Sequence, residues 1–284
     1  PAAGVRAAAT GDRHKYMMNG RKLGGWFIPG IERVDALRDF EAGVARDERL
    51  AKVLAAVLGD DFGPIIIRVE EALRAGVPPT EICRAMTYAG ATRTLRFHLK
   101  NEGDWHDVAN IYSYGHALYC AFQYAGSKEL LRAIFHGAVF MTYLRWLNMP
   151  AARVPQHGQT LGETFDSDEA MLERFGEFAD FQKVAEAEIL VSQYIEEGRD
   201  IGKLRHSLAH IMLREDAELH MFQVLEAAFR HYDLSNDPEE KRVHLLAATR
   251  YITAQKVMKN ILWSTENAER LQRGDLLSER EDGD

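Results

Sequence analysis

Apolar residues recur at intervals of three and four positions over most of the chain, from residue 34 to residue 273. This is the period of α-helices that bury one face, so the pattern predicts a series of helices. No stretch of strand length alternates between apolar and polar residues, and the β-branched run Ile65-Ile66-Ile67 falls inside a helical pattern. We therefore expect an all-α fold, a single bundle of about nine helices.

Local signals place the helix ends. Gly76 is expected to stop one helix, and Ser167 is expected to cap another by accepting a hydrogen bond from a free amide of its first turn. Asp168 and Glu169 follow Ser167 and place negative charge at the positive end of that helix. The expected helices span residues 34–42, 50–58, 63–75, 80–99, 105–124, 129–148, 169–197, 203–232 and 238–273.

The two ends of the chain lack this pattern. Residues 1–32 are rich in glycine and are predicted to form an irregular arm, whereas residues 276–284 form an acidic tail that is predicted to be disordered. Residues 33–275 then make up one helical domain. A wrapping arm or paired helix faces would make the protein a homo-oligomer, and a dimer is the simplest case.

The charge balance excludes some classes of partner. The chain of 284 residues carries a formal net charge of −8, which argues against binding to nucleic acid or to an anionic membrane surface. Its two cysteines, Cys83 and Cys120, lie far apart in apolar helical patterns and are expected to be buried, reduced thiols. No secretory signal is visible, and we expect a cytoplasmic protein.

Eleven histidines are the most distinctive chemical feature, and most of them fall within predicted helices. One stripe contains His206, His210, His220 and His231 at helical spacing, on the expectation that residues 203–232 form one unbroken helix. His206 and His210 are one turn apart, a spacing at which two imidazoles can bind one metal ion. Asp216 could orient His220. The alternative is that these histidines face solvent or bond to a neighbouring helix.

Two further groups of residues are candidates. His98 and Glu102 are four positions apart at a helix junction, where they could face one centre. Tyr112 and His116 share a face of the 105–124 helix with Tyr119, and His136 lies on the next helix. Such a group is typical of an aromatic substrate pocket, but it is equally typical of hydrogen-bonded pairs in a core. The ferritin-type pairing of Glu-x-x-His motifs on two helices is absent.

Several short motifs resemble a known group of proteins. They are Arg96-Phe97-His98, Asn101-Glu102, Asp104-Trp105, Leu147-Asn148-Met149-Pro150 and the run from Leu213 to His220. Together they resemble helical domains that accompany Rieske-type iron–sulfur modules and are loosely similar to questin-oxidase-like proteins, over roughly residues 60–275.

The resemblance implies an oxidoreductase or oxygenase that receives electrons from a ferredoxin-like partner. The positions carried over are His98, Glu102, His210, Asp216 and His220. This chain lacks the Cys-x-His pairs of a Rieske centre, so the electron donor would be a separate protein.

Three functions follow as hypotheses. The first is a metal-dependent oxidoreductase acting on a small aromatic or apolar substrate, with iron (or manganese or zinc) held by some of His98, Glu102, His136, His210 and His220. In it, Tyr112, His116 and Asp216 would serve catalysis. The second is a cofactor-free enzyme that uses histidines as general acid and base. The third is a non-catalytic scaffold or binding subunit.

Overall fold

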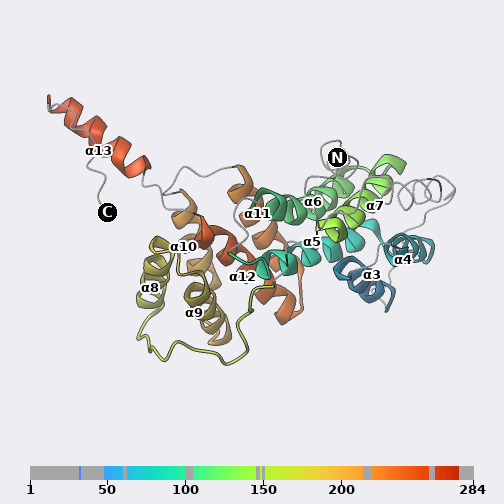
Figure 1. Ribbon diagram of the computed structural model, residues 1–284, viewed down its shortest axis with the longest axis horizontal. Helices are drawn as coiled ribbons and strands as arrows, with labels where there is room; N and C mark the ends of the chain where they lie inside the picture. Colours follow the sequence, from blue (N-terminus) through green and yellow to red (C-terminus); the bar gives the residue numbers. More distant parts are fainter. Residues whose placement is uncertain are drawn as a thin grey trace.

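The computed structural model describes residue 32 and residues 48–59, 63–99, 105–144, 148, 151–213, 219–255 and 260–274. Within these ranges the fold contains eleven complete helices and no strand, which confirms the all-α class (Figure 1). The predicted arm and the acidic tail lie outside the described residues, apart from Glu32. No helix in the described ranges is long and apolar enough to cross a membrane.

The helices fall into a central set and two flanking groups. The central set is α5 (Pro79–Leu95), α6 (Trp105–Tyr124), α11 (Leu219–Leu234) and α12 (Pro238–Ala254). On one side lie α3 (Glu48–Leu58), α4 (Gly63–Arg74) and α7 (Lys128–Tyr143). On the other lie α8 (Asp168–Asp180), α9 (Val184–Glu196) and α10 (Ile201–Leu213), while α13 (Asn260–Gln272) extends away from the bundle (Figure 1).

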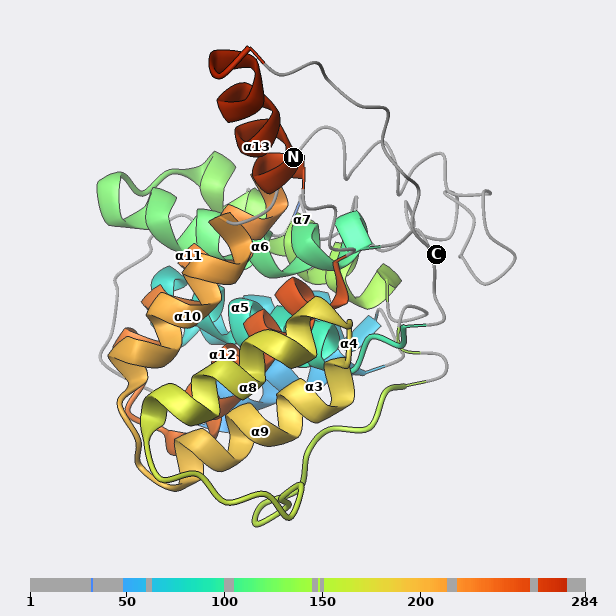
Figure 2. The ribbon, with the colours of Figure 1, turned by 90° about the vertical axis from the view of Figure 1, so that its left-hand side faces the viewer.

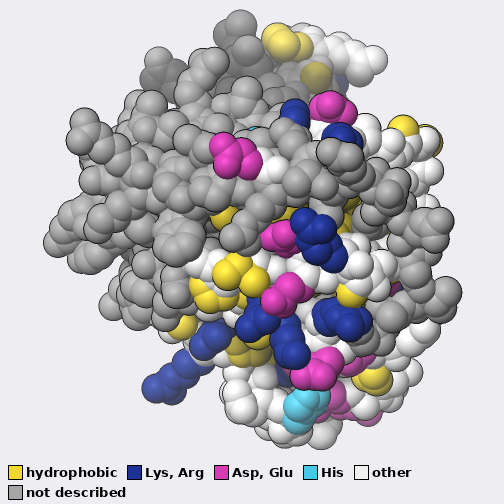
Figure 3. Space-filling model, turned by 90° about the vertical axis from the view of Figure 1, so that its right-hand side faces the viewer, with side chains coloured by type: hydrophobic (Ala, Val, Ile, Leu, Met, Phe, Trp, Pro, Cys, Tyr) yellow, Lys and Arg dark blue, Asp and Glu magenta, His cyan; other side chains and the backbone are white. Residues whose placement is uncertain are grey.

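The segment between α7 and α8 carries no helix of its own from residue 151 to residue 167. It runs along the lower edge of the bundle and passes beneath α9 before it reaches α8 (Figure 2). On another face of the molecule, Lys and Arg side chains gather beside acidic side chains and a histidine (Figure 3). The surface is therefore not uniformly acidic, although the net charge is negative.

Two glycines let α5 and α6 approach closely. A Cβ atom on Gly90 would lie 2.8 Å from the Cα of Tyr112, and one on Gly115 would lie 2.8 Å from the backbone nitrogen of Thr87. Real Cβ atoms do not approach other atoms so closely, so larger residues at these positions would push the helices apart. The tight crossing fixes the face of α6 that carries Tyr112 and His116 against the core.

Several predicted helix ends are confirmed. Gly76 adopts φ +82° just after α4, and the Val77 amide donates to the Ala72 carbonyl at 3.0 Å. This is the Schellman pattern by which glycine closes a helix. The Ser167 hydroxyl accepts from the Ala170 amide at 3.1 Å and so caps α8 as expected.

The prediction of unbroken helices over 169–197 and 238–273 is wrong. The span 169–197 is divided into α8 and α9 at Gln182, which adopts φ +51°. The span 238–273 is divided because α12 ends at Ala254 and Gln255 is extended. In the span 203–232, His206 and His210 are on α10 and His220 and His231 are on α11, and the residues that would join the two, 214–218, lie outside the described ranges.

Candidate active site

The buried face of α6 carries Tyr112, His116 and Tyr119, none of which is more than 6% exposed. Opposite this face lie His231 of α11 and His244 of α12, both fully buried. The ring centre of His231 lies 5.2 Å from that of His116 and 5.5 Å from that of His244. Three helices thus bring three imidazoles together in the interior, and we call His116, His231 and His244 the histidine cluster.

Hydrogen bonds join the histidine cluster to its neighbours. The Tyr112 hydroxyl lies 2.8 Å from Nδ1 of His244, and Nδ1 of His116 lies 3.2 Å from Nε2 of His231. On its other side, Nε2 of His116 contacts the carboxylate of Glu226. The Glu226 side chain is 62% exposed, so this end of the cluster reaches solvent.

Burial keeps the three imidazoles neutral. Loss of solvation lowers the pKa of His231 to about 2, and it also lowers the pKa of His116 and of His244. Burial raises the pKa of the Tyr112 hydroxyl well above its ordinary value. Each neutral imidazole has one donor and one acceptor nitrogen, so each can pass a proton from one side of its ring to the other.

A second set of polar side chains lies beside His244. Oε1 of Glu240 is 3.9 Å from Nε2 of His244 and 3.8 Å from Nη2 of Arg84. Burial opposes the charge on Glu240, but the neighbouring His244 and Ser235 outweigh it and lower the pKa of this carboxyl. Glu240 therefore places a negative charge beside His244.

A cleft of about 1050 Å³ lies between α5, α9, α12 and the segment 151–159. Its wall combines apolar side chains with several polar groups, and a concave site of this kind can hold a small molecule. Tyr88 lines the cleft, and its ring also packs edge-on against His244 at 6.0 Å between centres. Tyr88 is therefore the side chain that stands between the cleft and the histidine cluster.

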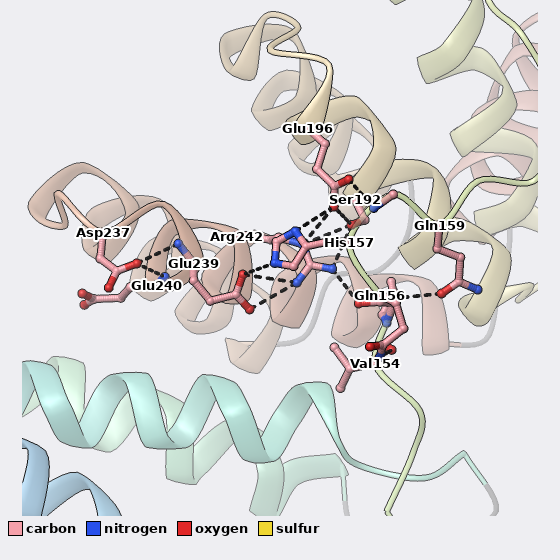
Figure 4. Close-up of polar contacts among 12 residues, drawn as sticks. Val154, Gln156, His157, Gln159, Ser192, Glu196, Asp237, Glu239, Glu240 and Arg242 are labelled. Carbon is pink, nitrogen blue, oxygen red and sulfur yellow. Dashed lines mark hydrogen bonds and ion pairs between the residues drawn. The ribbon is translucent and has the colours of Figure 1, made fainter.

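The segment 151–159 is fastened over the cleft by α9 and α12 (Figure 4). Nδ1 of His157 lies 3.3 Å from Glu196 of α9, and Nε2 lies 3.1 Å from Glu239 of α12. The amide of Gly158 also donates to Glu196 at 2.8 Å. Arg242, buried beneath, donates to the Pro155 carbonyl at 2.6 Å.

A buried ion pair lies at the floor of the cleft. Nη1 of Arg250 donates to both carboxylate oxygens of Glu188 at 2.8 Å, and its Nε donates to the Phe97 carbonyl at 3.0 Å. Burial raises the pKa of Glu188 to about 7, although Arg250 opposes this shift. A carboxyl that titrates near neutral pH beside a cleft is suited to acid–base chemistry.

The structure places the predicted catalytic residues Tyr112 and His116 in one buried cluster. Asp216 and Glu102 lie outside the described residues. His136 lies on α7, where burial lowers its pKa to about 4, and His98 follows α5. His210 is exposed on α10 and lines a separate surface hollow of about 810 Å³ with His206.

The proposed metal ligands are not gathered into one site within the described residues. No group of three or more His, Cys, Asp or Glu side chains in the described part of the chain has the arrangement of a metal site. His220 instead lies 3.2 Å from Gln223 through Nδ1, and its ring centre lies 4.9 Å from that of His106.

His244, Glu240 and Glu226 were missing from the sequence-based candidates. A signal for His244 existed. It lies in the apolar run Val243-His244-Leu245-Leu246-Ala247-Ala248, and a histidine within such a run is often buried. Glu226 gave no such signal, because a glutamate on the polar face of a helix is ordinarily a solvated surface residue.

Comparison with known proteins assigns the chain to no family. The chain matches no protein-family model, no curated protein and no solved structure. The function must therefore be argued from the geometry of the histidine cluster and the adjoining cleft.

Proposed function

We propose that the protein is an enzyme that uses histidines as general acid and base on a small substrate held in the cleft. The observation that carries this proposal is the buried hydrogen-bonded arrangement of Tyr112 with His244 and of His231 with His116. Burying several neutral imidazoles costs free energy that an apolar core would not, so the arrangement points to a chemical role.

The two hydrogen-bonded pairs place ionisable groups both near the cleft and near solvent. Glu226 accepts from His116 at the surface, and His116 exchanges a proton with His231 across 3.2 Å. His244 holds the Tyr112 hydroxyl at 2.8 Å and contacts the ring of Tyr88, which lines the cleft. In this proposal His244 and Tyr88 serve the substrate side, and His116 and Glu226 serve the solvent side.

Deuterium exchange tests the proposal without knowledge of the substrate. We would incubate the protein in D₂O with a metabolite extract and follow mass shifts with and without a chelator. We expect at least one compound to gain deuterium or to be consumed in the presence of the chelator. His231→Gln should abolish this change, and the exposed control His206→Gln should retain it. An extract left unchanged by the wild-type protein would refute the proposal.

An iron-dependent oxidoreductase is the second candidate. It is favoured by two buried nitrogens of the cluster, Nδ1 of His231 and Nε2 of His244, which have no hydrogen-bond partner among the residues that the structure describes. Imidazole nitrogens of this kind are ligands for iron, manganese and zinc. Metal analysis of protein purified without a histidine tag separates the candidates. Near-stoichiometric iron, lost in His231→Gln, would support the redox enzyme and its ferredoxin-like donor.

A further inference from the structure

The charge at one end of the cleft is opposite in sign to that of the whole protein. Arg96 and Arg153 both line the cleft, and both are exposed. Neither guanidinium group has an ion-pair or hydrogen-bond partner among the described residues, whereas the chain as a whole carries −8. Two unneutralised cations at the mouth of a cleft raise the local concentration of anionic ligands.

A backbone contact holds these two arginines at the same end of the cleft. The amide of Ala152 donates to the carbonyl of Arg96 at 2.8 Å. Arg153 is the next residue, so its side chain starts one residue away from this hydrogen bond. The pairing of the two segments thus brings both arginine residues to the same end of the cleft lining, whereas His157 lies further along the segment.

The acidic side chains of the cleft are already neutralised. Glu188 accepts two hydrogen bonds from Arg250, and Glu239 accepts from Arg242 at 3.2 Å and pairs with His157. Neither carboxylate is therefore available to offset Arg96 and Arg153. The uncompensated charge of the lining is positive.

Part of the lining is apolar. It includes the ring of Tyr88 and the side chains of Leu95, Val154, Ile189 and Val243. The volume of about 1050 Å³ is large enough for a ligand with an extended apolar body. An apolar ligand without charge would leave the two guanidinium groups unused.

We propose that the cleft binds an organic acid with an apolar or aromatic body, whose carboxylate is held by Arg96 and Arg153. Arginine forms paired hydrogen bonds with carboxylates, and two arginines fix the orientation of the acid group. The body then lies along Tyr88, on the side of His244. That this acid is the substrate rests on the proposed function, whereas its binding does not.

A matched pair of probes tests the proposal. Naphthalene-2-carboxylate and the neutral naphthalene-2-carboxamide share a body and differ in charge. We would titrate each into the full-length protein by calorimetry. We expect the carboxylate to bind about tenfold more tightly, or more, because charge-assisted bonds to arginine are lost in the amide.

Variants assign the effect to the two arginines. Arg96→Met with Arg153→Met should abolish the preference for the carboxylate. Arg68→Met, which changes a surface arginine of α4 outside the cleft lining, should keep it. Both variants are checked by circular dichroism, and the conservative pair Arg96→Lys with Arg153→Lys should retain part of the preference.

Three results would overturn the proposal: equal affinities for the two probes, a preference that survives in the double methionine variant, or no binding of the carboxylate. Calorimetry needs no turnover, so its outcome is independent of the deuterium experiment. Binding of the acid without any exchange would refute the acid–base enzyme and leave this ligand class standing.

Discussion

Tyr112 and His244 lie 132 positions apart in the chain, yet the hydroxyl of one is 2.8 Å from Nδ1 of the other, and neither side chain is exposed to solvent. The hydrogen bond joins α6 to α12 across the centre of the bundle. Because both groups are buried, bulk water cannot take the place of the missing partner if this hydrogen bond is lost.

Replacing Tyr112 by phenylalanine should therefore destabilise the protein. The change keeps the ring but leaves Nδ1 of His244 without its partner, and we expect a loss of about 1–3 kcal/mol in the free energy of unfolding. Urea denaturation measures this loss. Tyr124→Phe is the control, since Tyr124 is 91% exposed on the same helix. Equal stability of the two variants would contradict a bonded pair.

The histidine cluster should make the protein less stable in acid. The pKa of His231 is about 2 in the folded protein and about 6.5 when unfolded, so below pH 6.5 the unfolded chain binds the extra proton. This contribution to stability is complete above pH 6.5 and falls as the pH is lowered towards 2. The slope is up to about 1.4 kcal/mol per pH unit for each such histidine.

Urea titrations at a series of pH values from neutral to acid test this dependence. His231→Gln should give a shallower slope than the wild type, since one such histidine is removed. His206→Gln, at an exposed position on α10, should give the slope of the wild type. An unchanged slope in His231→Gln would show that His231 is already charged in the folded state.

The Glu188–Arg250 pair should behave as a unit. Arg250→Met leaves a buried carboxyl without its partner, and we expect a cost of about 3–5 kcal/mol. Glu188→Gln in the same chain removes the isolated charge and should restore part of the lost stability. Chemical denaturation of the two single variants and the double variant measures the coupling. Additive effects would mean that the two side chains do not interact.

Glu188 should give the free energy of unfolding a pH dependence opposite in sign to that from His231. Its pKa is about 7 when folded and about 4.5 when unfolded, so the folded protein binds the extra proton between these values. Its contribution to stability is present below pH 4.5 and is lost as the pH rises through 7. Infrared difference spectroscopy should detect a carboxyl that titrates near pH 7 and is missing in Glu188→Gln.

His157 should help to hold the segment 151–159. Its two nitrogens face carboxylate oxygens of Glu196 and Glu239 on two different helices (Figure 4). His157→Gln should speed hydrogen exchange at the Gly158 amide by a few-fold, because exposed ion pairs contribute no more than about 1 kcal/mol. Exchange mass spectrometry measures this, and unchanged exchange would show that His157 does not help to hold the segment.

The sequence predicted those parts of the fold that local chemistry determines. Gly76 and Ser167 could be placed because a left-handed glycine and a capping hydroxyl act within a few residues of themselves. The end of α8 could not be placed from the sequence, because the residue with left-handed backbone angles after it is Gln182 and not a glycine. There the Lys183 amide donates to the Phe178 carbonyl at 2.8 Å, so the same closing motif forms without glycine.

Only part of the candidate site could be predicted from the sequence, because the rest depends on contacts between distant segments. Tyr112 and His116 share a helix face, so their spacing could bring them together. His244 lies on α12, which is packed against α5, α9 and α11 and has few exposed positions. Such a helix has no polar face to mark its orientation, and the partner of His244 depends on contacts between distant segments.

The order of synthesis determines when the buried face of α6 can find its partners. The tight pairing of α5 and α6 through Gly90 and Gly115 involves neighbouring segments, so these two helices can associate early. His231 and His244 leave the ribosome more than a hundred residues after His116. Until then Tyr112 and His116 lack His244 and His231 as hydrogen-bond partners, and the buried histidine cluster can form only when α11 and α12 dock.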